Sequence, residues 1–416
     1  MAVPGAEELF LMVNPKSGGN KGEIFLKAPQ PFPVEVSPGR KVNLRIFSML
    51  DGSPGNKPGF QALKQTVARQ KPTRLVVGGG DGTVMWADGE CEKHGIDTTK
   101  DVIMGIVPLG TGNDFARSYG WGGKNPTNLE KDNWAKLRDM TANWANAIPT
   151  YHDVWNVKIN VNPSTGVVYK VGGDREEVST GKKILEGPLV NYFSVGMESR
   201  AGIFFDKKRT KSQLANLGVY ALAGAKTMFS CGQWDHIDSI IQGMWEGTSK
   251  SGQLIFNQCR EDQFPDLVGH PASLLFLNIN SYAGGNAEFW DVNRPSGREP
   301  ASPAAKIDVA QDPGDGRLEA VTIPRLSSIA MEKIYNDSLR VWSGGPYYLR
   351  FNDDTDDTPD DFEAWCNIDG EYYHLEDPND CTITLKKKIR TLRAPESCFI
   401  GVCPDDGEES ESDEDV

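Results

Sequence analysis

The chain has 416 residues and a formal net charge of −14, a length that exceeds what one hydrophobic core usually supports. Eight acids and no base lie in PDDGEESESDEDV (404–416), so the remaining residues carry a net charge of only −6. A mildly acidic body lacks the basic surface that nucleic-acid binding requires, which excludes that class of partner. We therefore expect at least two domains and no nucleic-acid site.

The cysteines and the N-terminus indicate the compartment. Seven cysteines occur without a CxxC pair, and only five histidines accompany them, so zinc modules are not expected. Reduced cytosolic thiols fit this pattern. The start MAVPGAEELFLMVNP lacks the basic and apolar regions of a signal peptide, and no apolar run approaches the ~20 residues of a membrane span. The sequence predicts a cytoplasmic protein with at most transient peripheral membrane association.

The first 150 residues alternate apolar runs with helical patterns. Predicted strands that are apolar throughout occupy residues 9–13, 43–50, 74–77 and 102–107. Predicted helices occupy residues 60–70, 83–95 and 129–147. Continuous apolar strands are typical of a parallel sheet that helices cover on both faces. This pattern predicts an α/β domain over residues 1–150.

The pattern changes after residue 150. Strand-like runs occupy 154–161, 166–171, 189–197, 273–280, 317–323, 347–351 and 381–389. A helical segment, 201–229, interrupts them. The sequence therefore predicts a mainly β accessory domain over residues 151–395. Residues 396–416 are expected to be a disordered acidic tail, because they cannot bury enough apolar surface.

Three glycine-rich loops follow strands of the first domain. They are Asn14–Gly19, Gly78–Thr83 and Pro108–Asp114. Glycine lets backbone N–H groups approach an anion closely, and open α/β sheets bind ligands at the carboxyl ends of their strands. The loops predict a nucleotide phosphate site, although none matches the P-loop pattern. An acid is unfavourable for phosphate binding alone, so Asp81 is expected to act on a proton or to hold Mg²⁺.

Longer motifs around these loops resemble a known family. GGGDGT (78–83), FLMVNPKSGGNKG (10–22) and PLGTGNDFARSYGWGG (108–123) resemble the catalytic domain of eukaryotic-type diacylglycerol kinases. The accessory domain of the same kinases is similar to NYFSVGMESRAGIFFDKKR (191–209), LNINSYAGG (277–285), DPGDGRLEAVTI (312–323) and NIDGE (367–371). The resemblance covers about residues 9–393. It implies a nucleotide domain related to NAD kinases, followed by a β-sandwich-like domain.

The activity that the resemblance implies is lipid phosphorylation. ATP, with Mg²⁺, would phosphorylate the free hydroxyl of 1,2-diacylglycerol to give phosphatidic acid and ADP. Asp81 would take the hydroxyl proton, or would hold Mg²⁺ while another group acts as the base. Thr83 would cap the following helix or contact phosphate, with capping favoured. The other residues expected at the nucleotide are Asn14, Ser17, Gly18, Gly78, Gly79, Gly80, Gly82, Thr111 and Gly112.

Further residues carry over from the family. Asn113 and Asp114 would shape the cleft near the acceptor hydroxyl, and Arg117, one helical turn later, is expected to pair with an acid. Glu371 matches a second catalytic carboxylate, although IDGE also contains a strong Asp-Gly hairpin turn.

A metal site is also implied. Asp312 and Asp315 match a structural Mg²⁺ site of bacterial relatives, because hard cations prefer carboxylate and carbonyl oxygens. Without the resemblance, DPGDG is simply a turn.

The resemblance also implies partners. Diacylglycerol would be met at a membrane surface, with recruitment through the basic stretches 204–213 or 385–393. The sequence indicates no protein partner and no oligomeric state.

Three alternatives were compared with this interpretation. Sphingosine and ceramide kinases share the GDG loop but differ from PLGTGND, and NAD kinases share only GGDGT. A catalytically silent lipid-binding scaffold would be expected to lack one of the acids Asp81, Asp114 and Glu371, and all three are present.

Overall fold

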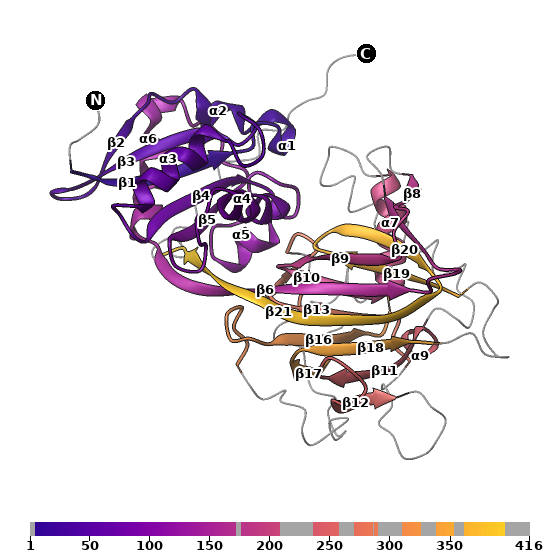
Figure 1. Ribbon diagram of the computed structural model, residues 1–416. Coiled ribbons are helices and arrows are strands. Elements are labelled where there is room, and N and C mark those ends of the chain that lie inside the picture. The colour runs from indigo at the N-terminus through magenta and orange to yellow at the C-terminus, as the bar shows by residue number, and fades with distance from the viewer. Residues whose placement is uncertain are drawn as a thin grey trace, which may run out of the picture.

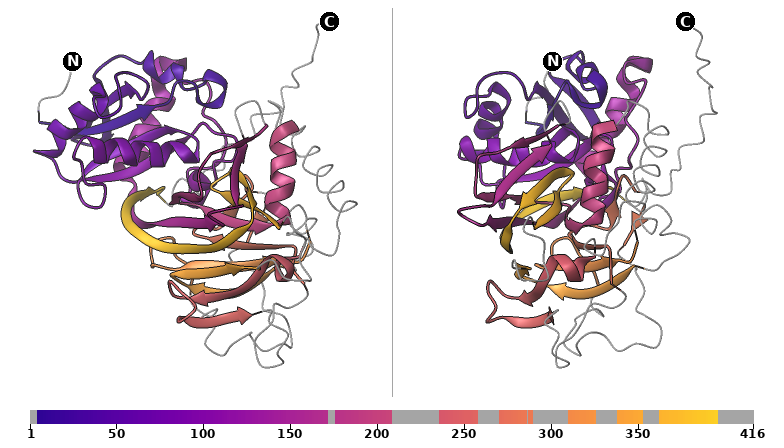
Figure 2. Two further views of the ribbon diagram at one scale, coloured as in Figure 1. Left: turned by 45° about the vertical axis from the view of Figure 1, so that its right-hand side comes forward. Right: turned by 90° about the vertical axis from the view of Figure 1, so that its right-hand side faces the viewer.

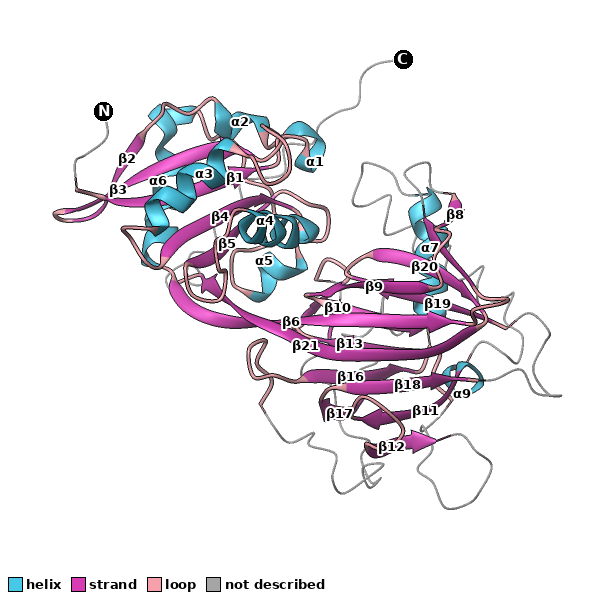
Figure 3. Ribbon diagram, viewed as in Figure 1, coloured by secondary structure: helices cyan, strands magenta, loops and turns pink. Residues whose placement is uncertain are grey.

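The structure is a computed structural model. It describes residues 5–171, 176–208, 236–257, 270–285, 287–289, 310–325, 338–352 and 362–395. Three predicted segments lie wholly or partly outside the described residues, drawn in grey in Figure 3: the tail, the later part of the 201–229 helix and the basic stretch 204–213.

The first domain is an α/β unit (Figure 1). Its strands are β1 (Glu7–Val13), β2 (Phe32–Ser37), β3 (Arg40–Ser48), β4 (Thr73–Gly79) and β5 (Val102–Pro108). Its helices are α1 (Ser17–Asn20), α2 (Glu23–Leu26), α3 (Pro58–Val67), α4 (Asp81–Lys93), α5 (Asp114–Ser118) and α6 (Lys131–Asn146). Strands β3, β1, β4 and β5 run parallel in that order, and β2 pairs antiparallel with β3 at the edge. The predicted fold class is confirmed.

The continuous apolar strands have buried residues on both faces of the sheet. In β1, Phe10 and Met12 pack in one core cluster with α3 and α4, whereas Leu9 and Leu11 pack in a second cluster with α2 and α6. Because successive strand residues point to opposite faces, both sets must be apolar. This explains why the strand has no polar alternation.

Two helices begin differently from the prediction. The helix predicted at 83–95 is α4, which begins at Asp81 and therefore includes the acid of the glycine loop in its first turn. In α6, residues 132–134 have positive φ angles, so its regular part begins later than residue 131. Proline at the first position of α3 fits a helix start, since its missing N–H would be unpaired there.

The described part of the accessory domain contains strands of two large sheets and the separate pair β14 and β15. Its strands are β6 (Ile148–Val161), β7 (Val167–Val171), β8 (Glu177–Ser179), β9 (Ile184–Leu189), β10 (Tyr192–Gly196), β11 (Ile241–Glu246), β12 (Gln253–Asn257), β13 (Ser273–Leu277), β14 (Ser281–Tyr282), β15 (Ala287–Glu288), β16 (Leu318–Ile323), β17 (Leu339–Gly344), β18 (Tyr347–Phe351), β19 (Glu363–Ile368), β20 (Glu371–Glu376) and β21 (Pro378–Arg393). Helices α7 (Met197–Lys208) and α9 (Ile237–Ile240) accompany them, and α7, the upright helix in both views of Figure 2, packs against β10, β19 and β20.

The two sheets share one core. The antiparallel sheet has the order β17-β16-β13-β10-β19-β20-β7-β8. It packs on strands β6, β9, β11, β18 and β21, and one cluster joins Phe193 and Phe276 of the first sheet with Val157 and Leu349 of the second. The predicted sandwich-like accessory domain is confirmed.

Two long strands connect the domains. Strand β21 pairs with β6 along most of its length. The C-terminal residues of β21 reach the first domain, where Thr391 pairs with Met104 of β5. The Trp121 indole donates to the Leu392 carbonyl at 2.8 Å. The chain therefore leaves the first domain through β6 and returns to it through β21, so residue 150 lies within a shared strand.

Candidate active site

The three glycine loops lie side by side. They follow β1, β4 and β5 at the carboxyl edge of the parallel sheet. The Asn14 N–H donates to the Gly78 carbonyl at 2.9 Å, and the Leu109 N–H donates to the Gly79 carbonyl at 3.0 Å. Each strand is thus bonded to its neighbour up to the point where the loops begin. The structure therefore brings together the residues that the sequence assigns to one nucleotide site.

Several loop glycines allow the loops to pack against each other. A β-carbon on Gly110 would lie 2.7 Å from Gly80 Cα, and one on Gly18 would lie 2.6 Å from the Leu109 carbonyl oxygen. Gly79 faces the Thr83 side chain at similarly short range. In contrast, Gly82 is exposed and has no heavy atom within 4 Å of its β-carbon position. Its backbone is open to a ligand, whereas Gly18, Gly80 and Gly110 are needed for close packing.

Asp81 occupies the first turn of α4 and contacts the start of α5. Its Oδ2 accepts from the Asp114 N–H at 3.0 Å, and its Oδ1 accepts from the Phe115 N–H at 3.3 Å. Burial raises the pKa of Asp81 to about 7, and the negative charges of Asp114 and Asp369 add to the effect, while the two hydrogen bonds oppose it. A carboxylate with a pKa near neutrality is suited to accept and release a proton.

The hydroxyl side chains of the loops differ in their surroundings. Thr83 is the third residue of α4, and that helix has no side-chain cap, so the predicted capping role is wrong. The cause is the early start of the helix at Asp81. Asn14 Oδ1 accepts from the Lys16 N–H at 3.1 Å and shapes its own turn. Ser17 is half-buried and Thr111 is exposed, which leaves both at the loop surface.

Asn113 shapes the third loop. It is buried, with a left-handed φ of 56°. Its Oδ1 accepts from the Gly110 N–H at 2.8 Å, and its Nδ2 donates to the carbonyls of Gly110 at 3.0 Å and Gly123 at 2.8 Å. Because both polar atoms of the side chain already have protein partners, Asn113 contributes loop geometry.

Asp114 joins the two domains. It is buried, and its carboxylate accepts from Ser281 Oγ at 2.6 Å, from the Gly284 N–H at 3.0 Å and from the Gly285 N–H at 3.2 Å. All three donors belong to the accessory domain. The same residue supplies the backbone N–H that binds Asp81, so one residue connects the accessory domain to the candidate catalytic carboxylate.

Arg117 makes a different contact from the one predicted. Its Nε donates to the Gly112 carbonyl at 3.1 Å, and its guanidinium fills the space that β-carbons on Gly123 and Gly285 would need. No acid of the described residues pairs with it. The expected acid partner is therefore replaced by backbone, because Asp114 is already occupied by the accessory domain.

Glu371 and Asp369 lie at opposite ends of one hairpin turn. Asp369 and Gly370 have positive φ angles and connect β19 to β20, which confirms the Asp-Gly hairpin. The Glu371 side chain is 59% exposed and pairs with Lys170 Nζ at 2.8 Å; its carboxylate also accepts from the Tyr373 hydroxyl. It is therefore anchored at the surface of the accessory sheet.

Asp369 was missed by the sequence interpretation. Its carboxylate accepts from the backbone N–H groups of Val190, Asn191 and Tyr192 at 2.7 to 3.0 Å. Burial raises its pKa to about 6. Its charge also contributes to the raised pKa of Asp81. The available signal was the aspartate of IDGE, which the sequence interpretation assigned to the hairpin turn alone.

Comparison with known proteins identifies the family. The model of the diacylglycerol kinase catalytic domain matches residues 8–141, and the model of the diacylglycerol kinase accessory domain matches residues 188–372. The chain belongs to the diacylglycerol kinase family. The two matches contain the glycine loops and the accessory loop that binds Asp114.

Relatives of this family differ in length from the chain. Diacylglycerol kinase 4 of Arabidopsis thaliana is 30% identical over 309 residues, which are 69% of this chain and 62% of that protein. Human diacylglycerol kinase zeta is 26% identical over 338 residues, which are 79% of this chain and 30% of that protein. The chain thus spans less than two thirds of either relative. A putative diacylglycerol kinase from Bacillus anthracis matches with 16% identity, a TM-score of 0.45 and coverage of 95% of this chain and 99% of that chain.

The metal site implied by the diacylglycerol kinase family was tested on the residues present. Asp312 Oδ1 accepts from the Gly314 N–H at 2.7 Å, and Asp315 Oδ1 accepts from the Arg317 N–H at 2.9 Å. Within the described ranges, no group of three or more histidine, cysteine, aspartate or glutamate side chains is placed to hold a metal ion. The Mg²⁺ site at Asp312 and Asp315 stays a prediction, since it calls for two carboxylates and a backbone carbonyl, and each aspartate here uses one oxygen on the loop's own backbone.

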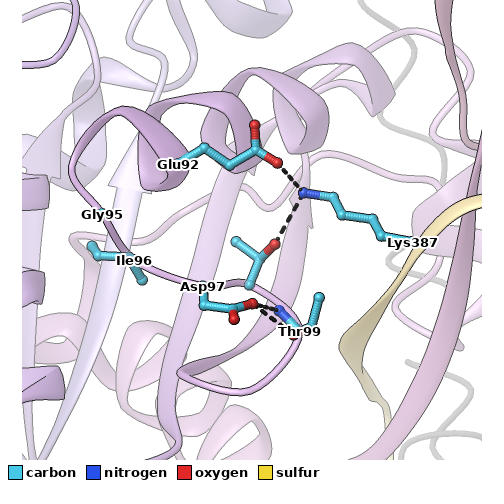
Figure 4. Close-up of a pocket in the computed structure, with 7 residues that line it drawn as sticks. Glu92, Gly95, Ile96, Asp97, Thr99 and Lys387 are labelled. Atoms are coloured by element: carbon cyan, nitrogen blue, oxygen red, sulfur yellow. Dashed lines mark hydrogen bonds and ion pairs between the residues drawn. The ribbon is translucent and has the colours of Figure 1, made fainter.

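A cavity beside α4 contains a second interdomain contact. Lys387 of β21 extends toward α4 (Figure 4), where its Nζ donates to Asp88 at 2.7 Å, Glu92 at 2.6 Å and Thr98 at 3.2 Å. The other residues around the cavity are Gly95, Ile96, Asp97 and Thr99. Since the ammonium already has three oxygen partners, this contact fixes α4, the helix that begins with Asp81.

This contact also reduces the charge available in the stretch that the sequence suggested for membrane binding. Lys387 and Lys388 both bind protein oxygens, so the basic stretch 385–393 presents less free charge to a membrane than the sequence suggests. Among the residues that the structure describes, no helix has the length and apolar character needed to cross a bilayer.

Proposed function

We propose that the protein is an ATP-dependent diacylglycerol kinase that converts 1,2-diacylglycerol and ATP into phosphatidic acid and ADP. The observation that carries the proposal is the position of Asp81. Its carboxylate, with a pKa of about 7, lies where the glycine loops meet the start of α5 and where Asp114 connects them to the accessory domain. The family membership supports lipid as the acceptor.

The reaction requires a proton acceptor and positive potential. The oxygen of the free lipid hydroxyl attacks the γ-phosphorus, the bond from that phosphorus to the β–γ bridging oxygen breaks, and ADP leaves. Asp81 takes the hydroxyl proton. Mg²⁺ that arrives with the nucleotide would neutralise charge on the phosphates. The exposed Gly82 backbone and the hydroxyls of Ser17 and Thr111 are the groups that would contact them.

The two acids of the accessory hairpin take different roles in this proposal. Glu371 would act as a second carboxylate near the acceptor, whereas Asp369 would hold the turn at 190–192. We expect Asp369→Asn to lower the melting temperature, because an amide cannot accept from three buried N–H groups. We expect Glu371→Gln to leave the melting temperature unchanged and to lower kcat. Unfolding curves and initial rates measured on both variants check this, and equal effects on stability would contradict it.

The pH dependence of the rate follows from the raised pKa of Asp81. A base must be ionised to accept a proton, so activity should rise with pH and level off above about pH 7. Below that pH the rate should fall about tenfold per unit, because the ionised fraction of Asp81, which alone can accept the proton, shrinks in that proportion. Initial rates at saturating Mg-ATP from pH 5.5 to 9 measure this. A rate that is constant over the range would contradict the base role.

The substrate is tested with purified chain, Mg-ATP and mixed micelles that contain diacylglycerol, sphingosine or ceramide. Labelled phosphate should appear in phosphatidic acid. Phosphorylated sphingosine or ceramide would support the reaction type but would contradict diacylglycerol as the acceptor lipid. ATP binding without any lipid product would contradict the proposed kinase activity and favour a lipid-binding scaffold. Association with vesicles in the same assay tests whether the protein meets its lipid as a peripheral membrane protein.

A further inference from the structure

The loop at residues 312–317 is fastened to strand β6. The Asp153 N–H donates to the Pro313 carbonyl at 2.7 Å, and the Gly316 N–H donates to Asp153 Oδ2 at 2.5 Å. A β-carbon on Gly314 would lie 2.7 Å from the Tyr151 side chain. The loop therefore packs directly on the strand that connects the two domains.

This packing gathers negative charge. Asp153 is fully buried, and its Oδ1 makes no hydrogen bond. Asp312 and Asp315 lie on the loop, and each uses one oxygen to bind a backbone N–H of the loop itself. Burial raises the pKa of Asp153 and of Asp315, and neighbouring aspartates add to both shifts. Asp312 and Asp315 are exposed, whereas a fully buried carboxylate such as Asp153 needs a cation nearby.

Lys388 of β21 supplies a positive charge at this position. It stands opposite Asp153 in the register of β6 and β21. Its Nζ donates to the Gly314 carbonyl and lies 3.5 Å from Asp153 Oδ1, the oxygen without a hydrogen bond. Its charge favours the ionised forms of Asp153 and Asp315. One ammonium therefore contacts both the strand and the loop.

A divalent ion would have to compete with this ammonium. Mg²⁺ requires near-octahedral oxygen ligands at ~2.1 Å and retains several waters. The Gly314 carbonyl and Asp153 Oδ1 are already engaged by Lys388. A second cation beside Nζ would also be repelled by it. Among the described residues, no third histidine, cysteine or acid joins such a pair of aspartates to form a cluster that could hold a metal ion.

We propose that Lys388 is the resident cation of the 312–317 loop and takes the place of a structural divalent metal. The loop and the β6–β21 crossover then form without metal. Any Mg²⁺ requirement of the chain belongs to its nucleotide. This inference does not depend on the proposed function.

The experiment is thermal unfolding of the metal-stripped full chain without nucleotide. Wild type, Lys388→Gln and the matched control Lys386→Gln are compared in EDTA, Mg²⁺ and Ca²⁺. Lys386 is exposed on the same strand, which makes it a suitable control. We expect the wild-type melting temperature to be the same in all three conditions. Lys388→Gln should lower it by several degrees, and Lys386→Gln should not change it.

Two outcomes would overturn the inference. One is a wild-type melting temperature that falls in EDTA and recovers with Mg²⁺ in a saturable way. The other is a Lys388→Gln variant as stable as Lys386→Gln. If Lys388→Gln does not fold, the wild-type arms and Mn²⁺ binding followed by electron paramagnetic resonance still decide the question. Asp153→Asn provides a further check, since Lys388→Gln should cost less in that background.

Discussion

Asp81→Asn is expected to lower kcat for lipid phosphorylation by roughly 10²- to 10⁴-fold, the contribution of a positioned general base. Asparagine keeps the shape of the side chain and one acceptor oxygen but cannot take a proton. The Phe115 or Asp114 N–H loses its acceptor, which costs little beside the loss of the base. The measurement is the initial rate at saturating Mg-ATP and saturating lipid.

The variant should remain folded. Burial raises the pKa of Asp81 to about 7, above its value in the unfolded chain, so ionisation between about pH 4 and pH 7 weakens the folded state. Asparagine removes this penalty at pH 8. The melting temperature at pH 8 should therefore not fall by more than about 2 °C.

Asp51→Asn serves as the control, because Asp51 is exposed in a loop outside the site. Retention of more than about a tenth of the wild-type kcat in Asp81→Asn would contradict the base role, since a general base contributes at least about 10²-fold. In that case Asp81 would be assigned to nucleotide or Mg²⁺ binding, and an increased KM for ATP would distinguish this from no role at all.

The sequence predicted the first domain well for a physical reason. Strands buried on both faces have continuous apolar runs, as in residues 9–13 of β1 and in β5, and a short window of sequence is enough to find them. The loops could be recognised because several glycines directly after a buried strand indicate a backbone that must turn tightly or be approached closely. What the sequence could not separate was packing from ligand binding: Gly80 and Gly110 approach each other, whereas Gly82 remains open.

The accessory strands were harder to predict. Strands β17, LRVWSG, and β20, EYYHLE, mix polar and apolar residues, and in β20 the buried Tyr373 and Leu375 alternate with more exposed neighbours. The prediction covered neither. Their placement depends on pairing partners far away in the chain, so local patterns are weak evidence for them.

The same large separation along the chain explains which functional residues the sequence analysis missed or assigned wrongly. Asp369 binds N–H groups nearly 180 residues earlier, and Lys387 binds α4 nearly 300 residues earlier. A register shift between Leu385 and Lys387 also changes which lysines point inward. A run of three lysines therefore resembles a membrane-binding surface in sequence, although two of them hold the fold together.

Asp114→Ala is expected to produce the second large effect, a joint loss of stability and activity. The substitution leaves Ser281 Oγ and two backbone N–H groups without their acceptor at a buried position. An unsatisfied buried donor costs about 1–3 kcal/mol, reduced where water enters. We therefore expect the melting temperature to fall by several degrees, as unfolding curves will measure.

Activity should fall together with stability, because Asp114 contacts both the accessory domain and the candidate catalytic carboxylate. Its side chain binds the accessory loop, and its backbone N–H binds Asp81. When the side chain is removed, α5 can shift, and misplacement by about 1 Å costs about 10²-fold in rate. Ser281→Ala removes one donor and leaves the other two bonds intact, so it should cause a smaller loss of both.

The comparison of Asp114→Ala with Ser281→Ala shows whether the two residues act through the same interdomain contact or independently. If Asp114 acts through the accessory loop, Ser281→Ala should add little in the Asp114→Ala background, because its partner is already gone. Additive losses would mean that the two residues act independently. Wild-type stability and rate in Asp114→Ala would mean that the accessory domain does not position Asp81. The activity of the first domain would then have to be explained by its own residues alone.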